Sequence, residues 1–231
     1  MEHREKPQVL FVFYTYSQQA RIITEAMAET FRERGCEVRQ ARIELTDPRY
    51  AERFSRFPLR HPYRDLFRML APQLRRATGE IRVPEDFHAG DPDLIVIGSP
   101  TWWLTMCMPI RSFLKSDDAG RVLAHKRFGA FVVCRRYWRN NLKTAERLGV
   151  AWGGAYAGGT HFAFAGGQVR SLLSLLSYLG KGEDCDRYLG VRIPPTNLQA
   201  DYPAQARAFA NGLADQLFAP EAPGGSPTPA S

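Results

Sequence analysis

Three short runs of apolar residues, none with an alternating polar position, constrain the fold of this chain most. They occupy residues 9–13, 94–97 and 128–134. A strand that is apolar on both faces has to be covered on both faces, which is typical of central parallel strands. A helical pattern follows each run, and strands that alternate with helices build a parallel sheet with right-handed crossovers. The sequence therefore predicts an α/β sheet with helices on both faces.

The spacing of apolar residues also predicts where helices begin and end. A first helix carries apolar residues three and four apart between Ile22 and Phe31, and Gly35 follows it as a stop signal. Further predictions are a helix over 140–148 ended by Gly149, a fifth strand over 150–156, a helix over 168–179 and a final helix over 201–218.

The turn after the first strand carries hydroxyl groups and leads directly into a helix. Thr15 and Ser17 lie in this turn, at the point where backbone N–H groups and the positive end of the helix dipole gather. A phosphate group is the ligand such a point favours. The alternative is an ordinary helix start with Ser17 as its N-cap.

Two adjacent tryptophans, Trp102 and Trp103, follow the second apolar run. Doubly wound sheets bind ligands beyond the carboxyl ends of their strands, where an aromatic ring can lie against a planar cofactor. The alternative is that one of the two indoles packs beneath its loop as part of the core.

These two loops resemble those of the flavodoxin-like FMN-binding superfamily, close to its NAD(P)H-dependent FMN and quinone reductases. The family's phosphate loop reads Tyr, Ser/Thr, any residue, Thr/Ser, Gly, Asn, Thr, and its second loop reads Ser-Pro, a variable residue, an aromatic, Trp. The chain has Tyr14-Thr15-Tyr16-Ser17-Gln18-Gln19-Ala20 in the first loop, and Ser99-Pro100-Thr101-Trp102-Trp103 with a later Pro109 in the second. Gln18-Gln19 stand where the family has Gly-Asn, and Ala20 replaces the last hydroxyl.

The resemblance implies a flavodoxin-like, doubly wound, five-stranded parallel sheet with helices on both faces. It implies FMN as cofactor, NADH or NADPH as electron donor, a small-molecule electron acceptor and a dimer or tetramer. The cofactor-binding residues that it implies are Thr15, Ser17, Gln18, Gln19, Ala20, Pro100, Thr101, Trp102, Trp103, Leu104, Cys134, Arg135, Tyr137 and Asn140.

In the family, the loop after the 128–134 strand closes over the flavin. Here Asn140 or Asn141 could meet the pyrimidine edge and Tyr137 or Trp138 could cover a ring face, or Asn140 could simply cap the next helix. Cys134 is either a reactive thiol or an inert buried one. Paired glycines frame residues 160–164 and suggest a hairpin-like extension, in which His161 is a proton donor or a structural residue.

The size and composition fit one domain over residues 1–218, with insertions at about 46–92 and 158–200, and a disordered tail over 219–231. The charged first residues and the lack of a long apolar run predict a cytoplasmic protein without a membrane segment. Four widely spaced cysteines and five histidines show no metal-binding spacing.

The first insertion is strongly basic. It contains nine arginines and three acids between residues 49 and 82, which gives a formal balance of +6 against +7 for the whole chain. Three interpretations stay open: a solvated helical cover, a site for an anionic substrate or the 2′-phosphate of NADPH, and, ranked last, nucleic-acid binding. Within it, Leu66, Phe67, Leu70 and Leu74 predict the inner face of a helix broken near Pro72.

The function expected from these features is an FMN-dependent oxidoreductase that transfers electrons from NAD(P)H to a quinone or another small electrophilic acceptor. The flavin carries the redox chemistry, so no catalytic side chain is assigned beyond His161 as a candidate. The alternatives are a flavodoxin-type electron carrier, disfavoured because flavodoxins are acidic, and a flavin-free binding module that uses the arginine-rich insertion.

Overall fold

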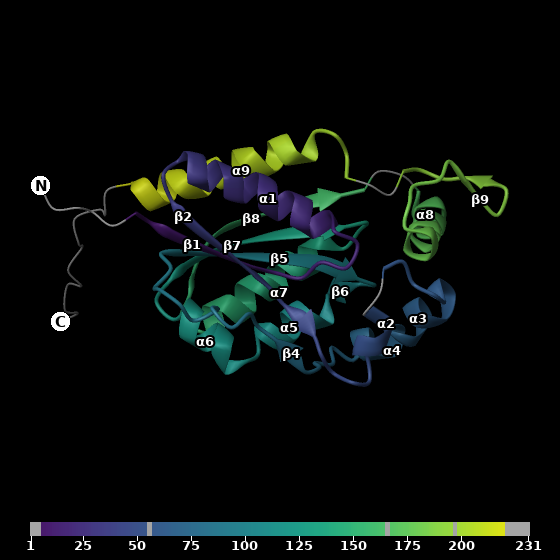
Figure 1. Ribbon diagram of the computed structural model, residues 1–231, viewed down its shortest axis with the longest axis horizontal. Helices are drawn as coiled ribbons and strands as arrows, with labels where there is room; N and C mark the ends of the chain where they lie inside the picture. Colours follow the sequence, from purple (N-terminus) through teal and green to yellow (C-terminus); the bar gives the residue numbers. More distant parts are fainter. Residues whose placement is uncertain (1–5, 55–56, 165–166, 196–197, 220–231) are drawn as a thin grey trace, which may run out of the picture.

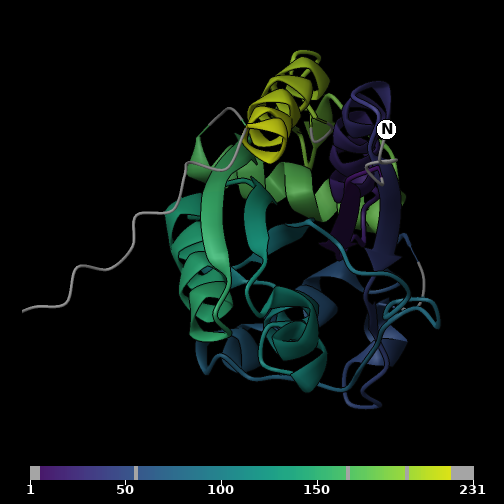
Figure 2. The ribbon, with the colours of Figure 1, turned by 90° about the vertical axis from the view of Figure 1, so that its left-hand side faces the viewer.

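The computed structural model describes residues 6–54, 57–164, 167–195 and 198–219. Its centre is a parallel sheet with the strand order β2-β1-β5-β7-β8 (Figures 1 and 2). The strands are β1 (Gln8–Phe13), β2 (Glu37–Arg42), β5 (Leu94–Trp102), β7 (Arg127–Cys134) and β8 (Ala155–Ala163). The predicted flavodoxin-like, five-stranded sheet is confirmed.

Helices cover both faces of this sheet, as predicted. On one face lie α1 (Gln19–Glu33) and α9 (Tyr202–Phe218), side by side in Figure 1, and on the other lie α5 (Met108–Phe113), α6 (Asp117–Leu123) and α7 (Trp138–Ala151). Successive residues of β1 enter different cores: Phe11 packs with α1 and α9, whereas Leu10 packs with α5 and α6. This double burial is why the strand sequences do not alternate.

The end of α7 and the start of β8 differ from the sequence prediction. Gly149 was expected to end the helix, but α7 continues to Ala151, and β8 begins only at Ala155. A Cβ on Gly149 would lie 2.3 Å from Cζ of Phe128, so this glycine serves close helix–strand packing rather than termination. Residues 160–163, expected in a hairpin-like extension, belong to β8 and pair with β7.

Helices from two chain segments lie beyond the carboxyl ends of the strands (Figure 1). The first contains β3 (Glu44–Leu45), α2 (Ala51–Phe54), α3 (Pro62–Arg68), α4 (Leu70–Leu74) and β4 (Ile81–Arg82), and the second contains α8 (Gln168–Lys181), β9 (Arg187–Tyr188) and β10 (Val191–Arg192). We call α2, α3, α4 and α8 the cap. The Leu59 N–H donates to the Leu179 carbonyl at 2.6 Å, and the Tyr63 and Tyr188 hydroxyls lie 2.7 Å apart, so the two segments form one cover.

The helix predicted around Leu66 is two helices, and the break falls at Met69 rather than near Pro72. Pro72 fits inside α4 because it lies in the first turn, where its missing N–H costs little. Leu66 faces inward, but Phe67 and Leu74 are each 51% exposed, so the predicted inner face is wrong at these two positions.

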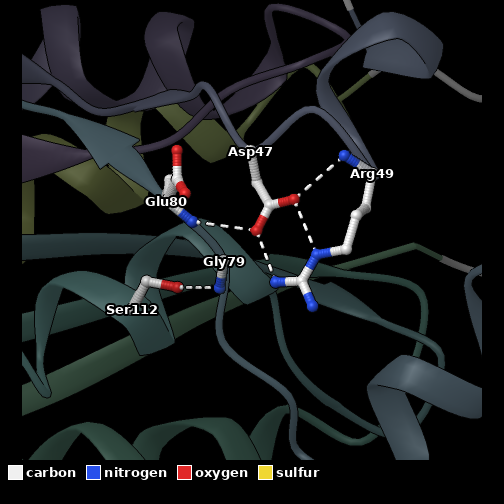
Figure 3. Close-up of polar contacts among 5 residues, drawn as sticks. All are labelled: Asp47, Arg49, Gly79, Glu80 and Ser112. Carbon is white, nitrogen blue, oxygen red and sulfur yellow. Dashed lines mark hydrogen bonds and ion pairs between the residues drawn. The ribbon is translucent and has the colours of Figure 1, made fainter.

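The base of the first segment is fixed by the buried carboxylate of Asp47 (Figure 3). Its Oδ1 accepts from the backbone N–H and Nε of Arg49 at 3.0 and 2.9 Å, and its Oδ2 accepts from the Glu80 N–H at 3.2 Å. The Gly79 N–H donates to the Ser112 hydroxyl at 2.9 Å, which ties the same strip to α5. The Arg49 side chain and these backbone donors hold the pKa of Asp47 well below its usual range.

None of the helices in the described part of the chain is both long and apolar enough to cross a membrane. The tail expected to be disordered lies, from residue 220 onward, outside the described residues.

Candidate functional site

A cavity of about 290 Å³ lies between the carboxyl ends of β1, β5 and β7 and the cap. Ligand pockets commonly have volumes of roughly 300–1,000 Å³, so it is at the small end of that range. Apolar and aromatic side chains dominate its lining, and Arg135 and Arg136 are the charged residues among those that line it. The aromatic ones are Tyr16, Phe54, Trp102, Trp103, Tyr137, Phe164 and Tyr178.

The first wall is the turn between β1 and α1. Gln18, at the N-cap of α1, has φ of +65°, a left-handed conformation that glycine adopts at least cost. The resemblance expects a glycine at this position, and here a glutamine adopts a conformation that favours glycine. The Gln18 side chain makes no capping hydrogen bond, and its Oε1 instead accepts from Arg21 Nε at 3.0 Å.

Thr15 holds a buried hydrogen-bonding group in this turn. The residue is 2% exposed and lines the cavity, and its Oγ1 is buried with no hydrogen-bond partner among the described residues. A buried hydroxyl without a partner costs about 1–3 kcal/mol, so native proteins rarely leave one unused. The hydroxyl and the start of α1 together fit an anionic group such as a phosphate.

The second wall is a β-hairpin where the sequence suggested a loop. β5 continues through Trp102 and pairs antiparallel with β6 (Thr105–Met106), with Thr101 opposite Met106 and Trp102 opposite Thr105. Trp103 occupies the two-residue turn with φ of +56°, which is rare for a bulky residue. This extension has no clear sequence signal, because Thr101 and Thr105 interrupt the apolar pattern.

Both tryptophans line the cavity, and the cap holds each of them. The Trp102 ring stacks on Phe54 of α2, with centroids 4.7 Å apart, and meets Tyr14 edge-on at 5.5 Å. Trp103 Nε1 donates to the carbonyl oxygen of Leu66 in α3 at 3.1 Å. The suggestion that one indole serves the core fits Trp102 better, since it packs against the cluster formed by β1, β5 and α5.

Two buried polar side chains, Gln73 and Arg111, donate hydrogen bonds to the hairpin. Neither was expected at the site from the sequence. Gln73 of α4 donates from Nε2 to the carbonyl oxygens of Trp102 and Met106 at 3.2 and 3.1 Å. Arg111 of α5 donates to the Thr105 hydroxyl at 2.8 Å and to the Gln73 Oε1 at 3.4 Å. The signal in the sequence was an arginine among the mostly apolar residues 108–114, and the structure shows why it matters: an arginine that is 2% exposed needs internal acceptors.

The third wall is the loop after β7. Tyr137 lines the cavity and precedes α7 with φ of +63°, so it is left-handed like Gln18 and Trp103. Burial raises the pKa of the Cys134 thiol to about 12, which fits the inert alternative. Asn140 does not cap α7, because the helix begins at Trp138, and it lines a shallow neighbouring hollow rather than the cavity.

Asn141, the other amide considered for the pyrimidine edge, is fully buried beneath the hairpin. Its Nδ2 donates to the Pro100 carbonyl at 3.2 Å and to the Thr101 hydroxyl at 3.0 Å. The side chain therefore positions the end of β5.

Arg135 is the cation best placed to act in the cavity. Its Nη1 donates to the hydroxyl of Ser171 in α8 at 2.7 Å, and the guanidinium carbon lies 5.1 Å from the Phe164 ring centroid. Nη2 is buried with no hydrogen-bond partner among the described residues. Burial lowers the pKa of Arg135 to about 10, against the opposing effect of Asp184.

His161, the candidate proton donor, is not among the residues that line the cavity. It lies on β8, where its ring stacks on Trp138 at a centroid distance of 3.7 Å. Burial, together with the nearby Arg139, lowers the pKa of His161. An imidazole with a lowered pKa is neutral at pH 7, and its stacking fits the structural alternative.

The structure brings together most of the residues expected at the cofactor site, drawn from all three loops. Those that line the cavity are Thr15, Ser17, Gln19, Ala20, Pro100, Thr101, Trp102, Trp103, Leu104, Cys134, Arg135 and Tyr137; Gln18 and Asn140 do not line it. None of the described arginines of the basic insertion lines it either, and seven of those eight are exposed, as in a solvated cover.

Comparisons with known proteins show the fold. No protein-family model matches the chain, and no curated protein matches it significantly. Among solved structures, it is similar to a flavoprotein from Lactobacillus acidophilus, solved in complex with FMN, with 14% identity, a TM-score of 0.51 and coverage of 67% of this chain and 93% of that one. It is also similar to oxidised flavodoxin 1 from Bacillus cereus, with 11% identity, a TM-score of 0.50 and coverage of 90% and 97%.

Proposed function

We propose that this protein binds FMN in the cavity and uses NADH or NADPH to reduce a quinone or another small electrophilic acceptor. The observation that carries the proposal is that three strand-end loops converge on one cavity. The loop after β1 brings to it the hydroxyl of Thr15, which is buried and has no partner in the described chain. Ligands of doubly wound sheets bind at this edge. The structural neighbour solved with FMN supports the choice of cofactor.

The residues of the cavity fit the two chemically different ends of FMN. Thr15, Ser17 and the start of α1 would hold the phosphate, since hydroxyl and backbone donors there suit an anion. Trp103, Leu104 and Tyr137 would contact the isoalloxazine ring, and the apolar lining would exclude water from it.

Bound FMN would supply two-electron chemistry, so that a dihydronicotinamide, a quinone and one proton give the oxidised nicotinamide and a hydroquinone. The chain contributes binding and orientation. The Cys134 thiol, with its pKa raised to about 12, stays protonated, and no acid or base among the cavity-lining residues is needed because solvent can supply the proton.

The cap favours an enzyme over a protein-to-protein electron carrier. A carrier has to bring the edge of its flavin against another protein, whereas here α2, α3, α4 and α8 lie over the carboxyl ends of the strands (Figure 1). Tyr178 of α8 reaches the first loop, where its hydroxyl donates to the Ser17 carbonyl at 3.4 Å. A covered cavity of this kind admits a small-molecule acceptor more readily than it admits the surface of another protein.

The test begins with titration of the purified protein into FMN while flavin fluorescence is followed. We expect saturable quenching of the flavin fluorescence. We then expect NADH or NADPH to bleach the bound flavin under anaerobic conditions, and two-substrate kinetic plots to give parallel lines. Quenching without direct reduction by either nucleotide would favour the carrier. Absence of quenching with a folded protein would refute FMN binding and leave a flavin-free binding module.

A further inference from the structure

The described residues that line the cavity carry positive charge and no negative charge. Among the described residues that line the cavity none is acidic, and the arginines are Arg135 and Arg136. Arg136 is exposed, but Arg135 extends beneath α8 and packs against Phe164. No ion pair joins Arg135 to a described acid, although Asp184 lies close enough to influence its pKa.

One nitrogen of the Arg135 guanidinium is hydrogen-bonded to α8, and another has no hydrogen-bond partner in the described chain. The Ser171 hydroxyl and carbonyl both accept from its Nη1, whereas Nη2 is buried and has no partner in the described chain. A buried N–H group of a cation is costly without an acceptor, and such a group commonly marks an unseen water or ion. Because Nη1 already donates to two acceptors on Ser171, the N–H bonds of Nη2 are the ones left to donate to the oxygen atoms of an anionic group.

We propose that Arg135 recognises an oxyanion, a carboxylate or a phosphate, on the acceptor, so that the acceptor is a flat apolar molecule with one anionic group. The apolar body would lie against the aromatic and leucine side chains of the cavity, including Leu172 and Leu175 of α8. This inference rests on the proposed function, because it assigns FMN and the acceptor to one cavity. It moves the anion-binding role from the basic insertion, none of whose described arginines lines the cavity, to the third loop.

The first experiment measures the binding of 2-naphthoate, 2-naphthyl phosphate and neutral 2-naphthamide to the FMN-loaded protein. At least one of the two anions should bind about tenfold to hundredfold more tightly than the amide, as charge-assisted hydrogen bonds imply. The carboxylate and phosphate probes identify which oxyanion is preferred. Equal dissociation constants for all three would overturn the proposal.

The matched variants are Arg135→Gln and Arg147→Gln, which remove the same charge. Arg147 is exposed on α7 and does not line the cavity. The preference for the anion should disappear in Arg135→Gln and stay in Arg147→Gln; its survival in Arg135→Gln would refute the assignment. Arg135→Lys keeps a cation without the fork and should reduce the preference, so it replaces the Gln variant if that variant does not fold.

The effect of Arg135→Gln on the affinities for FMN and riboflavin shows whether Arg135 binds the flavin phosphate or the acceptor. If Arg135→Gln weakened FMN but not riboflavin, the guanidinium would hold the flavin phosphate, and the acceptor proposal would fail while FMN binding stood. If the wild-type protein bound no FMN, the same probes would be followed by tryptophan fluorescence. The flavin proposal would then already be refuted by the lack of FMN binding, and a preference for the anions that depends on Arg135 would still support the oxyanion site.

Discussion

Replacing Thr15 with valine should stabilise the flavin-free protein and weaken FMN binding at the same time. Thr15 is 2% exposed, and its Oγ1 has no partner in the described chain, so the folded protein bears the cost of a buried hydroxyl. That cost is about 1–3 kcal/mol, and a methyl group in the same place avoids it. We expect the free energy of unfolding to rise by ~1 kcal/mol, or the melting temperature by about 2–4 °C.

The same change removes a donor that the proposed phosphate would use. A hydrogen bond to a charged group contributes about 1.5–3 kcal/mol, so the dissociation constant for FMN should rise roughly tenfold to hundredfold. Riboflavin lacks the phosphate and should bind both proteins equally. Thermal unfolding without flavin and fluorescence titration with each flavin measure the two effects independently.

Thr24→Val is the matched control, because Thr24 is also buried but its Oγ1 donates to the Ala20 carbonyl in α1 at 2.9 Å. It should bring no gain in stability and no change in the affinity for FMN. The reasoning is refuted if Thr15→Val loses stability without flavin, or if it weakens FMN and riboflavin to the same extent.

Three further changes test the other parts of the structure. Gln18→Gly should leave stability unchanged or raise it by up to ~1 kcal/mol in urea unfolding, and Gln18→Val should lower it, because Gln18 is left-handed. Trp103→Ala should weaken FMN by about 1–3 kcal/mol in fluorescence titrations; an unchanged affinity in a folded variant would remove Trp103 from the site. The pKa of Asp47 is lowered in the folded state, so the stability it contributes above about pH 4 is lost as the pH falls further. Below pH 4, the free energy of unfolding should therefore fall less steeply with decreasing pH in Asp47→Asn than in the wild-type protein. Equal slopes in the two proteins would contradict this explanation.

The sheet and α1 could be predicted from the sequence because burial leaves a local pattern there. Both faces of the central strands are covered, so unbroken apolar runs such as residues 94–97 identify them. The extension of β5 through Trp102 leaves no such pattern, because each of its pairs with β6 joins a threonine to an apolar residue: Thr101 to Met106 and Trp102 to Thr105. The end of α7 was mispredicted because Gly149 is a local stop signal that packing against Phe128 overrides.

The cavity lining was largely predictable, but its cover was not. The three loops follow strands that the sequence reveals, and parallel strands end at the same edge. The cap depends on contacts between distant segments: Leu59 bonds to Leu179, and the Phe57 ring lies 5.3 Å from the Tyr178 ring. The sequence of one segment does not indicate that it contacts the other. The number of arginines in the first insertion could therefore be read from the sequence, but their position relative to the cavity could not.

The backbone at the three walls gives a separate reason to locate function in this cavity. Gln18, Trp103 and Tyr137 are all left-handed without being glycine, and each belongs to a different strand-end loop. Such conformations cost about 1–3 kcal/mol each and persist where the surrounding structure holds them, as at ligand-binding sites. Gln73 and Arg111 hold the hairpin, and Trp103 is further tied to Leu66. The backbone shape of these three loops is therefore what the proposed FMN site requires, and in that proposal the unpartnered Thr15 hydroxyl would donate to the phosphate.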